Sequence, residues 1–242
     1  MRARNPDAPR LVEALGPAAV EPLCRLAADP DWQVREVALS LLGGLDDAYS
    51  TRALYAALSD EKAPNRRVAF DALKERPALP ASWLLAAFDA MTDKFVRPEL
   101  ALLLGRRDEL PTVELERRRA VETHPRTRRA LDAALAARGD RPSLDAVREF
   151  LERAPVASVS EALTLASYVG SRALIPALRA RLADEQALFY VTGHPDGPEE
   201  LRVCDLALMA ACAIAELPYS YARTPANYTA EQRAEVRGAL TY

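Results

Sequence analysis

The sequence predicts an all-α fold: a right-handed α-solenoid of about six two-helix repeats, with a small loop or β-hairpin insertion near 186–201. Three observations predict it. Half of the 242 residues are apolar, and alanine and leucine supply most of that half, which favours helices because these residues lose little freedom in a helix. The chain carries 18 prolines, which must lie between helices or in their first turns. The third observation is an internal repeat.

The repeat is clearest in the stretch DPDWQVREVALSLLGGL, which begins at Asp29. A shift of 31 residues places arginine on arginine, and small or aliphatic residues on one another. The matching residues are Arg35, Arg66, Arg97 and Arg128, and Ala38, Ala69, Leu100, Leu131 and Ala162. Within one unit the apolar residues follow helical spacing, and a fixed period of this size is typical of stacked helical hairpins.

Each repeat should contain two helices. In the first clear unit we expect a helix near 19–28, a turn at 29–31 and a second helix near 32–45. The Asp-Pro pair of the turn ends the first helix, and Asp31 can cap the second. The expected buried stripe of the second helix consists of Val34, Ala38, Leu41 and Leu42.

The same stretch resembles the HEAT-repeat pattern, with an aspartate near a proline turn, then Val-Arg, then alanine and leucine-glycine. Its short period is similar to that of bacterial HEAT-like repeats also found in relatives of phycobilisome lyases. The resemblance covers roughly 10–215 and implies one solenoid domain over 1–242, with an irregular final repeat and a capping helix within 202–242. Asn65 departs from it by replacing an expected valine, and the charged helix around 112–122 is out of phase.

The recurring arginine lies beside the expected stripe. Because it recurs wherever repeats would stack, we interpret it as structural, in contact with acids or carbonyls of adjacent repeats. Ligand binding is the alternative interpretation.

The period fails before the last helix pair. The best match to Ala38 falls at Ala207, 14 residues later than the repeat predicts. The segment ALFYV alternates and is β-prone, HPDGP contains turn residues, and LRV can form a return strand, so we expect a hairpin or ordered loop at 186–201.

Thr229 and Gln232 form a capping box that opens a last helix. The tyrosines expected to cover the end of the apolar stack are Tyr219, Tyr221 and Tyr228.

In solenoids of two-helix repeats, the second helix of each repeat usually lines the concave, partner-binding surface. Its mixed charge and scarcity of aromatic residues suit a polar protein partner better than a small hydrophobic cofactor. We therefore expect a non-enzymatic protein–protein interaction scaffold or adaptor that is monomeric and uses no cofactor. In the insertion, Phe189 and Tyr190 either anchor a partner or cap the C-terminal end on Leu206 or Met209. The candidate partner-binding residues are Glu36, Arg67, Asp71, Arg129, Phe189, Tyr190 and His194.

Two other functions stay open. Residues 97–141 hold eleven arginines against eight acids, and some DNA-alkylation-repair glycosylases are HEAT-like solenoids that hold DNA in a basic groove. The other alternative is a lyase-type, tetrapyrrole-handling protein. The small local excess and the net charge of −3 favour a solvated, salt-bridged face over a nucleic-acid surface. The arginines that would contact nucleic acid are Arg106, Arg107, Arg117, Arg118, Arg126 and Arg129.

Chemistry-bearing motifs are missing from the sequence. It contains no phosphate-binding loop, nucleophile elbow or dinucleotide fingerprint. His124 and His194 lack partners at ligand spacing, so we expect no metal site, and His124 should be an exposed turn residue. Cys24, Cys204 and Cys212 form no C-x-x-C pair, and we expect them to be small buried hydrophobic residues. We predict no catalytic residues.

The excess of arginine over lysine indicates a GC-rich coding sequence and a bacterial source. The N-terminal stretch MRARNPDAPRLVEALG lacks an apolar run long enough for a signal peptide, and no segment reaches the length of a membrane span. We therefore expect a cytoplasmic protein with no membrane partner.

Overall fold

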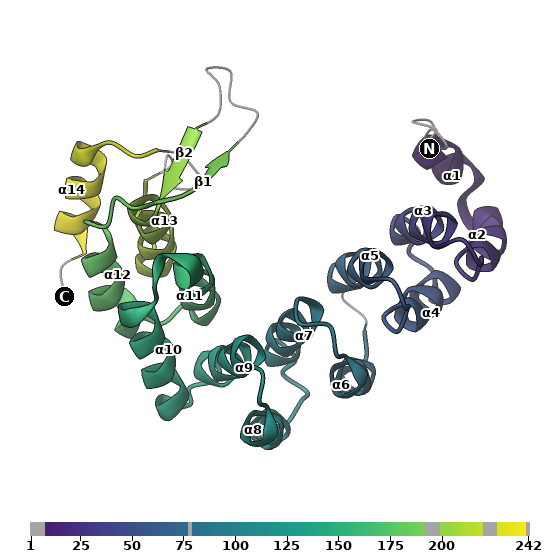
Figure 1. Ribbon diagram of the computed structural model, residues 1–242, viewed down its shortest axis with the longest axis horizontal. Helices are drawn as coiled ribbons and strands as arrows, with labels where there is room; N and C mark the ends of the chain where they lie inside the picture. The colour runs from purple at the N-terminus through teal and green to yellow at the C-terminus, as the bar shows by residue number, and fades with distance from the viewer. Residues whose placement is uncertain (1–7, 77–78, 192–198, 220–226, 241–242) are drawn as a thin grey trace. The chain divides into compact units, whose positions relative to one another are not determined.

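The computed structural model describes residues 8–76, 79–191, 199–219 and 227–240, and most of these residues are helical. The described part of the chain contains a single two-stranded sheet besides its helices (Figure 1). The prediction of an all-α fold with a small hairpin is therefore confirmed. The chain divides into two compact units, Met1–Leu110 (unit 1) and Pro111–Tyr242 (unit 2).

Unit 1 consists of helices joined by short turns. Its elements are α1 (Ala8–Leu15), the 3₁₀ helix η1 (Gly16–Ala19), α2 (Val20–Leu26), α3 (Trp32–Gly43), α4 (Ala48–Ala57), α5 (Ala63–Lys74), α6 (Ala81–Ala90) and α7 (Val96–Gly105). Helix α3 packs on α2, α4 and α5, and α5 packs in turn on α4 and α7. In Figure 1, α3, α5 and α7 form one row of unit 1, and α2, α4 and α6 form the other.

The start of α3 follows the sequence closely, whereas its buried face differs from the prediction. The carboxylate of Asp31 caps the helix by accepting a hydrogen bond from the Gln33 backbone N–H at 2.9 Å. The buried side chains of α3 are Ala38, Leu39 and Leu42, and the expected Val34 and Leu41 are only partly buried. The buried face is rotated toward Arg35 because α3 is covered by helices on more than one side, and because Arg35 has ion-pair partners that allow it to lie there.

The C-terminal end of α3 approaches α5 closely at Gly43. A Cβ atom at this position would lie 3.0 Å from the Ala72 Cβ, closer than side chains normally pack. The glycine therefore permits the contact between these two helices.

Unit 2 continues with helices and the hairpin. Its elements are α8 (Thr112–Val121), α9 (Pro125–Ala137), α10 (Arg141–Arg153), α11 (Val156–Val169), the 3₁₀ helix η2 (Arg172–Leu174), α12 (Ile175–Arg181), β1 (Ala187–Val191), β2 (Glu199–Arg202), α13 (Val203–Ala215) and α14 (Ala230–Ala239). Helix α9 packs on α8, α10 and α11, and α13 packs on α11, α12 and α14.

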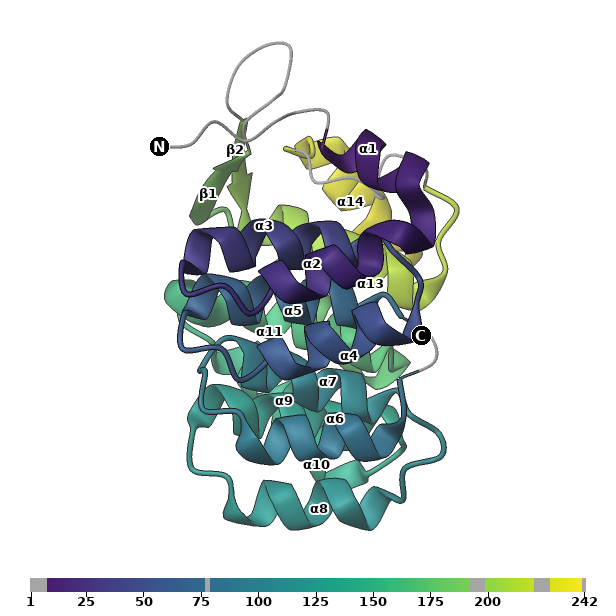
Figure 2. The same ribbon diagram turned by 90° about the vertical axis from the view of Figure 1, so that its right-hand side faces the viewer.

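The predicted insertion forms an antiparallel hairpin that lies next to α13 (Figure 1). Figure 2 shows its two strands side by side. Phe189 pairs with Leu201 and Tyr190 pairs with Glu200, with an irregularity in the register between Ala187 and Phe189. Buried Leu201 anchors strand β2, which runs directly into α13.

The C-terminal helix is held by the predicted capping box and by a buried aspartate. Gln232 N–H donates to the Thr229 hydroxyl at 3.2 Å, and Thr229 N–H donates to the Gln232 side chain at 2.9 Å. Tyr228 is buried as expected, with its backbone N–H donating to Asp205 at 3.0 Å. Tyr219 is partly buried, and Tyr221 lies outside the described residues.

Candidate functional site

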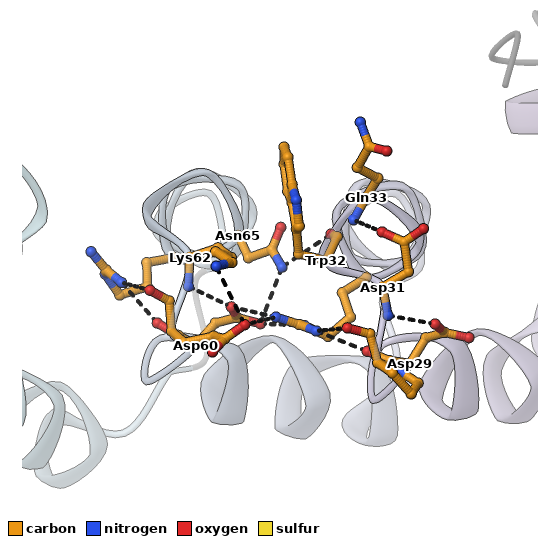
Figure 3. Close-up of polar contacts among 11 residues, drawn as sticks. Asp29, Asp31, Trp32, Gln33, Asp60, Lys62 and Asn65 are labelled. Carbon is orange, nitrogen blue, oxygen red and sulfur yellow. Dashed lines mark hydrogen bonds and ion pairs between the residues drawn. The ribbon is translucent and has the colours of Figure 1, made fainter. Parts of the chain in front are cut away.

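Asp60, in the turn between α4 and α5, joins two successive helical hairpins (Figure 3). Its Oδ2 accepts hydrogen bonds from Arg35 Nε at 2.7 Å and from Asn65 Nδ2 at 3.1 Å. Its Oδ1 accepts from Arg35 Nη2 at 3.0 Å and from the Lys62 backbone N–H at 2.8 Å. Because Arg35 belongs to α3, the pair ties the α2–α3 hairpin to the α4–α5 hairpin.

The same arginine also closes its own turn. Arg35 Nη1 donates to the carbonyl oxygens of Asp29 at 2.8 Å and Pro30 at 3.1 Å, while Asp29 caps the turn by accepting from the Asp31 N–H at 2.8 Å. Each of these groups fixes another, so the guanidinium is held in one orientation.

One period later, Arg66 repeats the arrangement. Its Nη1 donates to the carbonyl oxygens of Asp60 at 2.8 Å and Glu61 at 3.1 Å, and its Nη2 lies 2.6 Å from Asp93 Oδ2. Arg97 donates to the Met91 carbonyl at 2.7 Å in the same manner. The structural interpretation of these arginines is confirmed.

The fourth matching arginine, Arg128, breaks the series. It is exposed and makes no such contact within the described part of the chain. The preceding helix α8 is the one whose sequence is out of phase, so the turn before α9 has no counterpart of the Asp60 geometry.

Hydrogen bonding sets the charge state of the turn aspartates. Burial alone would raise the pKa of the Asp60 carboxyl, but hydrogen bonds from Arg35, the Lys62 N–H and Asn65 outweigh burial and lower it to about 2. In Asp93 the same opposition, with Arg66 and the N–H groups of Phe95 and Val96 as donors, also lowers the pKa. Both carboxylates are therefore ionised well below neutral pH.

Asn65, the residue that replaces an expected valine, is fully buried. Its Nδ2 donates to the Trp32 carbonyl at 3.2 Å in addition to Asp60, so the side chain connects the start of α3 to the turn before α5. Valine at this position could make neither bond, which explains why the repeat departs from its pattern here.

Arg76 is a second buried arginine, and the periodicity gave no signal for it. Its Nη2 donates to the carbonyls of Leu42 at 3.0 Å and Leu45 at 2.7 Å and to the Ser50 hydroxyl at 3.2 Å. Burial lowers its pKa. The role of Arg76 can be recognised only from the backbone carbonyls that it contacts.

The expected partner-binding residues of α5 lie in a network of charges on its exposed side. Arg67 Nε is 2.8 Å from Asp71, Lys74 Nζ is 2.8 Å from the same carboxylate, and Arg67 also pairs with Glu99 of α7. Burial opposes ionisation of Asp71, but hydrogen bonds from Lys74 and Arg67 prevail and lower its pKa. We call the charged residues of α3, α5 and α7, namely Glu36, Arg67, Asp71, Lys74 and Glu99, the second-helix face.

In unit 2 the expected partner-binding residue Arg129 of α9 forms an ion pair with a residue of another helix. Its Nε and Nη2 contact the two carboxylate oxygens of Glu161 on α11 at 2.8 and 2.9 Å, and its guanidinium lies 4.4 Å from the centre of the Phe150 ring. The pairing is bidentate and stacked, which holds the side chain in place.

The arginines expected to contact nucleic acid are divided between the two units. Arg106 and Arg107 belong to unit 1, and the other four belong to unit 2. Arg117 and Arg118 both pair with Glu114 on their own helix at 2.9 Å, and Arg126 also has a partner.

The hairpin presents an aromatic side chain to solvent. Phe189 is 50% exposed, so about half of its surface is open to solvent. Tyr190 lies on β1 opposite Glu200, and His194 lies outside the described residues.

His124 differs from its expected role. It is partly buried and caps α9, with its Nδ1 accepting from the Thr127 N–H at 3.4 Å. Its sequence neighbours, a following proline and a threonine three residues on, are compatible with such a cap.

The cysteines of α13 are buried, as expected, and Cys24 is only partly so. Burial raises the pKa of both α13 thiols, that of Cys212 to about 11. Among the described residues, no group of three or more histidine, cysteine, aspartate or glutamate side chains could hold a metal ion.

A hollow of about 650 Å³ between α11 and α13 was not foreseen. Its apolar lining includes Leu163, Leu206 and Met209, and the hydroxyls of Thr164 and Ser167 already donate to carbonyls one turn back in α11. The hollow depends on which neighbours cover α13, which no local sequence pattern encodes.

No known protein family matches the sequence, and no characterised protein matches it significantly. None of the described helices has the length and apolar character needed to cross a lipid bilayer.

Proposed function

We propose that this chain is a non-enzymatic scaffold or adaptor of bacterial origin that binds another protein, built as one HEAT-like array of two-helix repeats over residues 1–242. The Arg35–Asp60 and Arg66–Asp93 contacts support it most strongly, because they recur at the spacing of the repeat and join successive hairpins. A rigid array of this kind presents one side of every second helix in a fixed orientation.

The second-helix face is the proposed binding surface in unit 1. Its charges are already paired with one another, as in the Arg67 contacts with Asp71 and Glu99. Such a prearranged surface favours a polar partner, because its side chains lose little further freedom on binding.

The hairpin is the second proposed contact. Half-exposed Phe189 offers rigid aromatic area of the type that dominates interface energies.

The pairing of Arg117 and Arg118 with Glu114 argues against the nucleic-acid alternative. Glu114 offsets part of the positive charge of these guanidinium groups, so the helix attracts phosphates less than its number of arginines suggests. We therefore do not favour that function.

The test is affinity capture from a native bacterial lysate with matched variants. We expect a protein that the wild type retains and that Arg67→Glu and Phe189→Ala release. Arg52→Glu on α4, outside both regions, is the control and should retain it. Repeated capture with no protein recovered, or a protein that all three variants retain equally, would argue against the proposal.

A gel shift with duplex and single-stranded DNA and RNA at low salt tests the alternative directly. Retardation at micromolar protein that weakens steeply with added salt would favour nucleic acid instead.

A further inference from the structure

A second hollow, of about 490 Å³, lies between α12 and α14 in unit 2. Small residues and arginines form most of its lining, together with Leu182 and Glu185. The small residues are Ala183, Ala230, Ala234 and Gly238, and the arginines are Arg179, Arg233 and Arg237. We call this hollow the basic groove.

The sequence of α14 builds one side of the groove. Its small residues and arginines recur at intervals of three and four, which places them on a single helix face. Val236 of α14 and Leu240, which follows the helix, are buried. A Cβ atom added at Gly238 would meet no atom within 4 Å, so the groove is open at that end.

The charge of the groove is only partly compensated. Arg233 donates to the Tyr228 carbonyl at 2.9 Å and pairs with Glu185. Arg179 and Arg237 have no such partner within the part of the chain that the structure describes, and Arg179 is partly buried. A cation that is partly withdrawn from water without a counter-charge is destabilised, and a bound anion would relieve this cost.

We propose that the basic groove binds an acidic segment of a partner protein. Carboxylates of that segment would pair with Arg179 and Arg237, because planar guanidinium groups match carboxylates in bidentate geometry. The small residues between them leave room for the backbone of the segment.

The shape of the groove favours a chain segment over a single anion. At 1.5 Å of rise per helical residue, the row from Ala230 to Gly238 extends about 12 Å, longer than one phosphate occupies. Duplex nucleic acid fits less well, because tight binding needs several phosphate contacts and the groove offers two uncompensated arginines in a chain of net charge −3.

This site is separate from the second-helix face and the hairpin, so it can hold even if the proposed function fails. Its test uses the full-length protein and a fluorescein-labelled oligoglutamate peptide, followed by fluorescence anisotropy at low salt. Oligolysine and a short DNA duplex of equal label are the comparison probes.

We expect oligoglutamate to bind the wild type and the two arginines to carry that binding. The double variant R179E/R237E should raise Kd about tenfold or more. Ala234→Trp, which fills the groove at an exposed position, should do the same without any change in charge. The control Arg52→Glu, an exposed arginine of unit 1, should bind as the wild type does, and circular dichroism should show that all variants stay folded.

Four results would overturn the proposal. The first is no oligoglutamate binding at peptide concentrations up to about 1 mM. The second is equal weakening by Arg52→Glu, which would indicate non-specific attraction. The third is retention of binding in Ala234→Trp, which would place the peptide elsewhere, and tighter binding of the DNA duplex would likewise reject an acidic peptide as the ligand.

Discussion

Neighbouring helical hairpins are tied together by arginine in both units, but the acceptors differ. In unit 1, Arg35 reaches across to the carboxylate of Asp60, at 2.7 Å. In unit 2, Arg181 reaches across to backbone carbonyls, those of Leu151 at 2.9 Å and Ala154 at 2.9 Å, and its carboxylate partner Asp184 is three residues away on the same turn. A carboxylate can be protonated and a carbonyl cannot, so the Arg35–Asp60 connection of unit 1 should respond to acid and the Arg181 connection of unit 2 should not.

The largest expected effect comes from an exception to this contrast, the carboxylate of Asp205 in unit 2. It is 0% exposed and accepts from Arg202 Nε at 3.0 Å and from the Tyr228 N–H at 3.0 Å. Hydrogen bonding to Asp205 raises the pKa of Arg202. Because arginine is not deprotonated in proteins, removal of the carboxylate would leave the guanidinium charged and without this partner. We expect Asp205→Ala to lower the free energy of unfolding by about 3–5 kcal/mol in urea denaturation.

The matched control for this change is Asp145→Ala on α10. Asp145 also pairs with an arginine three residues away, Arg148 at 2.7 Å, but it is 61% exposed. We expect a loss below about 1 kcal/mol. Similar losses for the two variants would mean that the Asp205 contacts contribute no more than an exposed pair.

The next prediction compares the connection through a carboxylate in unit 1 with the connection through backbone carbonyls in unit 2. Asp60→Asn removes the charge that Arg35 contacts, and we expect a loss of about 1–2 kcal/mol after allowance for solvent screening. Asp184→Asn should cost less, because Arg181 keeps its contacts to the carbonyls of the neighbouring hairpin. Chemical denaturation of both variants measures the difference, and a larger loss for Asp184→Asn would reverse the comparison.

The smallest expected effect on stability is that of Phe189→Ala, which we expect to affect binding and not the melting temperature. Phe189 is 50% exposed, whereas Phe88 of unit 1 is fully buried. We expect Phe189→Ala to change the melting temperature little, while Phe88→Ala should cost about 3–5 kcal/mol. A drop of several degrees in Phe189→Ala would show that the hairpin aromatic belongs to the core, and the proposed anchor would then be wrong.

Short sequence motifs and the 31-residue repeat predicted the helix caps, the hairpin and the structural role of one recurring arginine. The Asp31 cap, the Thr229–Gln232 box and the structural role of Arg35 each depend on a few neighbouring residues or on the repeat itself. The hairpin was predictable because β-prone residues flank turn residues.

The features that could not be predicted depend on which helices and turns pack against one another, and the local sequence does not specify this. The buried face of α3 turned toward Leu39, since several helices cover it. Arg76 binds carbonyls of an earlier turn, and carbonyls are present at every residue, so no sequence signal distinguishes those that it contacts. The exposed charges of the second-helix face were identified as residues, but their partners, such as Glu99 for Arg67, were not.

The pH dependence follows from the direction of the aspartate shifts in unit 1. The pKa of Asp60 is lowered to about 2, and those of Asp71 and Asp93 are also lowered. A lowered pKa means that the unfolded chain binds protons more readily than the folded one. The stability from these groups is therefore fully present above about pH 4 and is lost as the pH falls toward the folded-state values.

An acid titration followed by two signals tests the contrast between the units most directly. Both tryptophans, Trp32 on α3 and Trp83 on α6, lie in unit 1, so tryptophan fluorescence reports on that unit, while far-ultraviolet circular dichroism reports on the helices of both. As the pH is lowered from about 5 to about 2, we expect the fluorescence transition to come at a higher pH than the main loss of helical signal. Coincident transitions, or a loss of helical signal that precedes the fluorescence change, would contradict the assignment of the acid-sensitive connections to unit 1.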